Sequence, residues 1–281
     1  MSLLIKPPSW GHCTSNYVGT APSTLGTNLT AAANDADGTA VSALTAVGHD
    51  VEFLAIMAHG FNTTGANSST LLDVLVDPAG GSSWTPIVND LLVGQSLSAS
   101  QTVPIAVYYY FPIWLKSGNS IGFRARTAHT ADVTTGRVVV HAFGGNANPG
   151  SWWCGQTVET IGVDDTISQG TNHTAGVSSA FSTWTNFGTA ISKPCGAIQF
   201  GVHGTNTDTT QAGNNYCWEF GVASTRIGPP IYRSTNTTES GFSLPTGPIF
   251  VSLPASTQLM VRAAAFGASA EPIDVAAYAV I

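Results

Sequence analysis

The sequence contains very few charged residues. Only 9% of its 281 residues are Asp, Glu, Lys or Arg, against about a quarter in typical soluble proteins. The nine basic residues are scattered, so no basic stripe is present and we expect no nucleic-acid partner. Charge depletion is also a feature of buried interface cores. We therefore expect neighbouring subunits to cover much of the surface, with a neutral soluble protein as the alternative.

The sequence also lacks a long apolar run. No stretch could span a bilayer as a helix. The first apolar segment, Leu3 to Ile5, is interrupted by Pro7-Pro8 and is too short for a signal peptide. We expect no membrane span, and we expect a protein that is either cytoplasmic or released by a route outside the usual secretion pathway, such as cell lysis.

Motifs of known chemistry are missing as well. There is no phosphate loop, nucleophile elbow or metalloprotease helix, and no pair of acids placed for glycoside cleavage. The segment Asn34–Thr39 resembles part of a calcium loop, but Leu44 stands where the bidentate Glu is expected. We therefore expect no enzyme, no catalytic residue, no cofactor and no metal.

The chain has four cysteines, and they fit no zinc spacing. With no secretion signal, reduced thiols are the expectation. A disulfide between Cys195 and Cys217 stays open, because it requires their strands to be neighbours. The four are Cys13, Cys154, Cys195 and Cys217.

The chain repeats itself. The run Gly26–Ala31 returns as Gly170–Ala175, an offset of 144 (170 − 26). His59-Gly60 returns as His203-Gly204 at the same offset (203 − 59 = 144). Further on the offset becomes 138, which predicts that the second copy has lost six residues, most simply in the turn-rich stretch between Asp77 and Pro104. We therefore expect two units, residues 1–147 and 148–281, joined near residues 146–150.

Strand patterns dominate both units. Short β-branched or aromatic segments alternate with Gly-, Asn-, Ser- and Thr-rich turns, whereas the alanine-rich segment 31–47 is a poor helix candidate. This pattern predicts an all-β chain of two tandem β-sandwiches, each resembling a jelly roll. The expected strands are 53–57, 71–76, 104–110, 121–126 and 137–143, then 197–203, 216–222, 249–253, 259–264 and 273–281.

Two pairs of residues recur at equivalent places. His59 and His203 each precede a glycine and have no acidic or cysteine neighbour in sequence, so we expect structural histidines whose ring nitrogens bond loop backbone. Arg124 and Arg262 each follow an apolar residue within a strand. We expect each arginine to clamp loop carbonyls or a carboxylate.

Aromatic residues offer a second interpretation. Trp84 and Trp152 are the candidates for exposed contacts, because aromatic rings on a β-sandwich can stack against sugars or anchor a partner protein. A glycan-binding module for attachment to a host surface is therefore the alternative function.

The segment Ile249–Ala263 resembles a recurring pattern in structural proteins of tailed bacteriophages. In that pattern an apolar strand leads into Pro-Ala-Gly-Ser/Thr and then into an alternating strand that ends in Arg. Here Ser256 replaces the usual Gly. The resemblance implies a non-enzymatic virion component of the tail, baseplate or capsid decoration. Its expected partners are other virion proteins and further copies of itself, and its expected location is the virion.

Overall fold

The computed structural model describes residues 11–17, 21, 24–61, 68–96, 106–128, 134–145, 154–163, 170–202, 214–235, 245–267 and 272–281. The regular elements of these residues are all strands, and none of them forms a helix that could cross a membrane. The all-β prediction is therefore confirmed. The expected junction at residues 146–150 lies outside the described residues.

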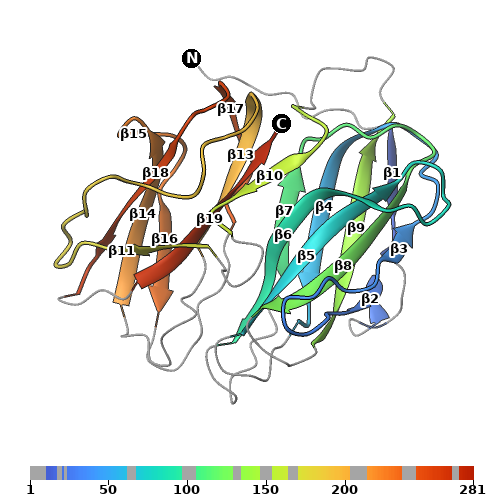
Figure 1. Ribbon diagram of the computed structural model, residues 1–281, viewed down its shortest axis with the longest axis horizontal. Coiled ribbons are helices and arrows are strands. Elements are labelled where there is room, and N and C mark those ends of the chain that lie inside the picture. The colour runs from blue at the N-terminus through green and yellow to red at the C-terminus, as the bar shows by residue number, and fades with distance from the viewer. Residues whose placement is uncertain are drawn as a thin grey trace.

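Nineteen strands are described, nine in the first half of the chain and ten in the second (Figure 1). The first half contains β1 His12–Ser15, β2 Thr27–Thr30, β3 Val41–Leu44, β4 Val51–His59, β5 Ser68–Asp77, β6 Thr85–Ser96, β7 Val107–Phe111, β8 Ser120–Ala128 and β9 Thr135–Gly144. The second half contains β10 Val158–Ile161, β11 Thr171–Thr174, β12 Thr185–Asn186, β13 Cys195–Val202, β14 Asn214–Val222, β15 Thr225–Arg226, β16 Ile231–Thr235, β17 Ile249–Leu253, β18 Leu259–Ala265 and β19 Pro272–Val280.

The strands of the first half form two facing sheets. One sheet has the order β1-β9-β4-β7, with β2 also paired to β9, and the other contains the order β3-β8-β5-β6. If β1 and β2 count as one strand, this is the pairing order of an eight-stranded jelly roll. The jelly-roll prediction is thereby confirmed for this half.

The strands of the second half pair in the same order. β10 and β11 both pair with β19, which pairs with β13, which pairs with β17. On the other side, β12 pairs with β18, β18 with β14, and β14 with β16. The short β15 is an addition that pairs with the end of β14. The second half therefore has jelly-roll pairing as well.

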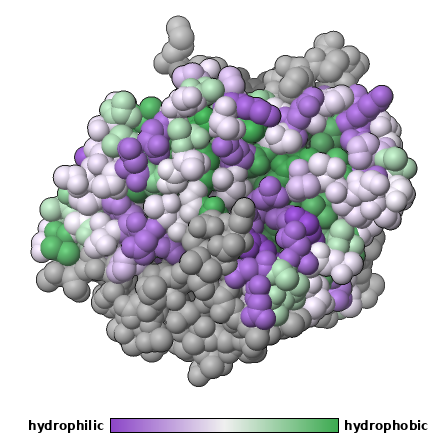
Figure 2. Space-filling view, viewed as in Figure 1, coloured by the Kyte–Doolittle hydropathy of each residue, from purple (hydrophilic) through white to green (hydrophobic). Residues whose placement is uncertain are grey.

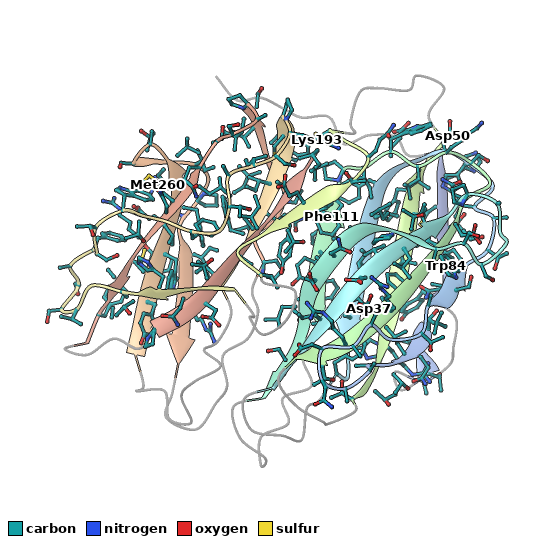
Figure 3. The ribbon with its side chains drawn as sticks, in the orientation of Figure 1. Asp37, Asp50, Trp84, Phe111, Lys193 and Met260 are labelled. Atoms are coloured by element: carbon teal, nitrogen blue, oxygen red, sulfur yellow. The ribbon has the colours of Figure 1, made fainter. Side chains whose placement is uncertain are left out.

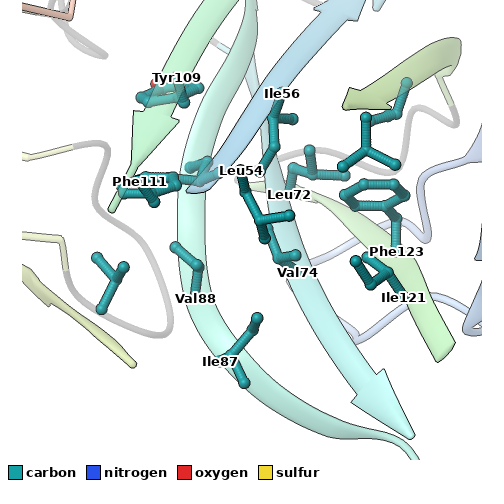
Figure 4. Close-up of a cluster of buried hydrophobic side chains, with 14 of the residues drawn as sticks. Leu54, Ile56, Leu72, Val74, Ile87, Val88, Tyr109, Phe111, Ile121 and Phe123 are labelled. Atoms are coloured by element: carbon teal, nitrogen blue, oxygen red, sulfur yellow. The ribbon is translucent and has the colours of Figure 1, made fainter. Parts of the chain in front are cut away.

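One sheet runs through both halves. It has nine strands, and β10 of the second half lies parallel to β6 of the first, with Val158 opposite Val88. The first hydrophobic core lies between the sheets of the first half, where side chains of β4, β5, β7 and β8 interdigitate (Figure 4). Ala276 and Tyr278 of β19 also belong to this core. A separate core, which includes Trp218 and Phe220, fills the second half.

The most prominent strand that the sequence did not predict is β6. We expected a loop between Asp77 and Pro104, with Pro78–Ser83 as turn material; of the described residues there, 78–82 form turns and bends and 85–96 form β6. Apolar and polar side chains do not alternate regularly along β6, because its pairing with β5 is irregular at several points. Asp90 within it even adopts a left-handed φ of 59°, a conformation that breaks the regular pleat.

The pairing also corrects one part of the repeat alignment. The sequence offset of 144 placed Cys217 at the position of Asp73. In the structure Asp73 lies opposite Arg124 and Glu219 lies opposite Arg262, so this strand pair corresponds at an offset of 146 (219 − 73). The difference is an even number of residues, and it therefore leaves the same side chains facing the core.

Candidate functional site

Arg124 is held by two carboxylates on the outer face of the first half. Its Nε donates to Asp73 Oδ2 at 2.7 Å, and its Nη1 lies 2.6 Å from Asp37 Oδ2. Asp73 is the register partner of Arg124 on β5, whereas Asp37 reaches it from the loop before β3. Figure 3 shows Asp37 on the near side of the first half. The arginine therefore ties a loop to the sheet.

A second arginine continues this network. Arg126 Nη2 lies 2.7 Å from Asp90 Oδ1, and Nη1 lies 3.5 Å from Asp35 Oδ1. Burial lowers the pKa of Arg126, and the neighbouring carboxylates, first that of Asp90, more than offset this, so that its net pKa is raised. The backbone N–H of Asp90 also donates to Asp73 Oδ1 at 2.9 Å, which joins the two arginine sites.

These residues line a pocket of about 460 Å³. Its lining contains four aspartates and two arginines, a formal charge of −2. Both aspartates of the calcium-like segment, Asp35 and Asp37, face arginines. Within the described ranges, no group of three or more His, Cys, Asp or Glu side chains could hold a metal ion. Figure 2 shows a group of hydrophilic residues to the right of the centre of the viewed face.

The corresponding arginine of the second half is held differently. Arg262 Nη2 lies 2.6 Å from Glu219 Oε2, and Arg226 Nη1 lies 3.0 Å from the other oxygen of Glu219. The guanidinium carbon of Arg262 lies 4.5 Å from the ring centre of Phe181 and 4.7 Å from that of Trp184. Phe181 occupies the place that Asp37 has in the first half (181 − 144 = 37). The second half thus presents aromatic rings where the first presents acids.

The structure describes four of the six residues that the sequence singled out. Arg124 and Arg262 bind carboxylates as described above. Trp84 is half-buried, and a Cβ on Gly122 would lie 2.8 Å from two atoms of its ring, so the indole lies against the sheet. His59 ends β4 with its Nε2 buried; we expected bonds to loop backbone, but this nitrogen has no hydrogen-bond partner among the described residues. His203 and Trp152 lie outside the described residues.

A different histidine is built into the second half. His173 Nε2 lies 3.0 Å from Ser182 Oγ, and Nδ1 lies 3.0 Å from Thr185 Oγ1. Its ring meets Trp218 edge-on at 5.7 Å. Burial lowers the pKa of His173, and both ring nitrogens contact hydroxyl groups, so the neutral form suits this place. At the repeat offset of 144, the residue that corresponds to His173 is Leu29 (173 − 144 = 29), so the repeat did not single out this histidine.

The two halves meet through polar groups that the sequence did not reveal. The side-chain amide of Gln199 on β13 donates to the carbonyl of Tyr110 and accepts from its N–H. It thereby caps the edge of β7. Tyr109 donates to the carbonyl of Leu92 at 2.7 Å, and the N–H of Leu92 donates to the hydroxyl of Tyr278 at 3.4 Å. The bonds of Gln199 and Tyr278 fix the second half against the first.

All four cysteines are free. Cys195 lies on β13 and Cys217 on β14, which belong to different sheets, so their strands are not hydrogen-bonded neighbours. Burial raises the pKa of the Cys195 thiol to about 11, which keeps it protonated near neutral pH.

Comparisons with known proteins give no family. No family model matches the chain, and no curated protein matches it. Among solved structures, the STIV major capsid protein matches with a TM-score of 0.40 and 12% identity over 96% of both chains. A chain of Sulfolobus turreted icosahedral virus matches with a TM-score of 0.37 and 11% identity, over 96% of this chain and 90% of that one. A tandem CBM22 pair from Paenibacillus barcinonensis matches at 0.31 and 13%, over 96% and 91%. TM-scores this low carry no conclusion about function.

Proposed function

We propose that this protein is a non-enzymatic structural component of a virion or virus-like particle and that it acts through protein–protein interfaces. The observation that carries the proposal is the presence of two jelly-roll pairings joined by one sheet in a chain with so few charges. Jelly rolls recur in viral capsid domains, and a charge-poor surface suits burial against neighbouring subunits. On both outer faces, the arginines described above are engaged with carboxylates of the same chain.

The resemblance of Ile249–Ala263 to structural proteins of tailed bacteriophages supports a place in the tail, the baseplate or the capsid decoration of such a phage. In the structure Leu253 ends β17, a turn follows, and β18 begins at Leu259. Ser256 in this turn has a left-handed φ of 66°, a conformation that glycine adopts at the least cost. The corresponding Gly118 has a φ of 90°. The local geometry thus explains why glycine is the usual residue of the pattern.

The experiment is to purify nuclease-resistant particles from the producing culture and to quantify their proteins by mass spectrometry. We expect the chain to co-sediment with the protected genome in many copies per particle. Immunogold labelling then distinguishes the tail or baseplate from the capsid. Recovery of the chain only from the soluble fraction, with none in particles, would refute the proposal.

We also propose that the two halves, residues 1–147 and 148–281, are tandem copies of one ancestral unit. Beyond the strand pairing, details of the loops recur. Asn34 and Asp35 have φ values of 55° and 61°, and Ser178 and Ser179 have 55° and 64°. An experimental structure whose halves superpose over all eight strands supports a duplication, whereas different strand connections in the two halves contradict it.

A glycan-binding module is the second candidate. Lectin domains also use jelly rolls, and the Phe181 and Trp184 rings beside Arg262 combine stacking surfaces with hydrogen-bond donors. Phe181 is 40% exposed. A glycan array should then show retention that is lost in Phe181→Ala and kept in Tyr17→Ala, whose ring is exposed in the first half. Equal retention by both variants, or none by the wild type, removes this candidate.

A further inference from the structure

One sheet face has a different environment in each half. In the second half, Gln199 and Tyr278 are opposite each other on β13 and β19, and so are Ala197 and Val280. All four are at most 1% exposed, because this face packs against the first half. Ala197, Tyr278 and Val280 are part of the first core. The first half therefore covers this face of the second.

The corresponding face of the first half lies on β4, β7 and β9. Ala55 is opposite His141, just as Gln199 is opposite Tyr278 (199 − 55 = 144; 278 − 141 = 137). Met57, Ala55 and His141 are half-buried rather than buried. Tyr108, directly opposite Met57 on β7, is 47% exposed. We call these four residues, with Tyr110, the open face.

The open face has no Asp, Glu, Lys or Arg side chain and is rich in aromatic rings. Rings of Phe53 and Tyr110 lie 6.3 Å apart, and Tyr17, which is 54% exposed, lies 6.2 Å from His141. Contiguous apolar surface of this kind marks a contact site, and aromatic residues dominate the energetics of such sites.

The matching partner surface is on the second half. The first half contacts β13 and β19 through β7, where the backbone of Tyr110 bonds the side chain of Gln199 and the ring of Tyr109 meets that of Tyr278 edge-on at 5.3 Å. The strand register places β17 at the corresponding position (249 − 111 = 138). On β17, Phe250 is 51% exposed and Ile249 and Val251 are only half-buried. Two surfaces meet inside the chain, the β13–β19 face and β7. Their counterparts, the open face and β17, are both exposed.

We propose that the open face of one molecule packs against β17 of a second copy, so that copies repeat between chains the contact made by the two halves within a chain. The two surfaces differ, which makes the contact head-to-tail; such contacts close into rings or extend as filaments. This inference rests on the proposed function, because it names the surface through which the structural component associates with itself.

The test uses one substitution on each surface, Tyr108→Asp and Phe250→Asp, in the full chain. Light scattering coupled to size exclusion should give the wild type a mass well above the 29.0 kDa of one chain. A carboxylate buried at either surface should weaken association at least about 100-fold. Each variant should therefore elute as a monomer, whereas Tyr232→Asp, at a ring 65% exposed on β16, should keep the wild-type mass.

Mixing the two variants provides the decisive measurement. Tyr108→Asp retains an intact β17, and Phe250→Asp retains an intact open face, so an equimolar mixture can form one intact junction and should give a dimer. A mixture that stays monomeric, a monomeric wild type, or variants with the wild-type mass would each overturn the proposal. Circular dichroism checks the fold, and Tyr108→Ser with Phe250→Ser replaces any variant that fails to fold. Presence in particles, which tests the proposed function, is measured separately on the wild type.

Discussion

Replacement of Asp274 by asparagine should stabilise the protein at neutral and alkaline pH. Asp274 lies on β19, is 3% exposed and accepts a hydrogen bond from Asn172 Nδ2 at 3.2 Å. Burial raises its pKa to about 7, although the bond from Asn172 acts in the opposite direction. In the unfolded chain the pKa of an aspartate is about 3.9. The folded state therefore keeps a proton that the unfolded state releases.

The sign and size of the effect follow from this difference. Between about pH 4 and pH 7 the folded state binds more protons than the unfolded state, so the free energy of unfolding falls as the pH rises. The shift of about three pH units corresponds to about 4 kcal/mol, fully lost above about pH 8. The asparagine of the variant cannot ionise, and its side-chain oxygen can still accept the bond from Asn172. The free energy of unfolding of the variant should therefore equal that of the wild type near pH 4 and should be about 4 kcal/mol larger near pH 8.

Urea unfolding of both chains at several pH values between about 4.5 and 8 measures this difference. Other titrating groups are common to the two chains and cancel when one curve is subtracted from the other. Thr225→Ala serves as the control, because it exchanges two side chains that do not ionise at an exposed position and should give a constant difference. A difference for Asp274→Asn that does not change with pH would refute the reasoning.

Four further outcomes are expected. Asp90→Asn should lower the free energy of unfolding by about 3 kcal/mol in a urea titration, because the buried Arg126 loses its closest carboxylate; an unchanged midpoint contradicts this. Gln199→Leu should lower it by about 1–3 kcal/mol, since the N–H and carbonyl of Tyr110 lose their partner; Gln258→Leu, at a part-exposed site, is the comparison. Because burial lowers the pKa of His173, this histidine should contribute a loss of stability as the pH falls below about 6.5, where it gains a proton in the unfolded chain; the free energy of unfolding of the wild type minus that of His173→Phe should therefore decrease as the pH falls through this range, and a difference that does not change with pH argues against it. Gly122→Ala should displace the Trp84 indole, which a Cβ would meet at 2.8 Å, and shift its fluorescence to longer wavelength relative to Gly48→Ala, where no atom lies within 4 Å.

The sequence predicted the fold class because alternation of side chains is a local signal. Strand β17 was predicted with its observed bounds, Ile249–Leu253, where β-branched and aromatic residues stand between turn residues. β6 was not predicted, because Pro86 and the irregular pairing around Asp90 obscure the alternation. The two-residue error between β5 and β14 went undetected because a period of two is unchanged by an even shift.

The site residues were harder to anticipate. Arg124 and Arg262 were found because they recur at equivalent places. Their main carboxylate partners, Asp73 and Glu219, lie on neighbouring strands that are distant in sequence, and the sequence does not show locally which strands will pair. Gln199 and Tyr278 carry no repeat signal, since Ala55 and His141 stand in their places in the first half. Their role depends on contact between the halves, which only the assembled sheets reveal.

The contribution of β19 to the first core has a consequence for biosynthesis. Tyr278 follows Leu92 by 186 residues, yet its hydroxyl receives the N–H of Leu92 deep in the first half. During translation, the earlier half cannot complete its packing until β19 has left the ribosome exit tunnel. The core of the earlier half therefore stays incomplete while most of the later half is being made.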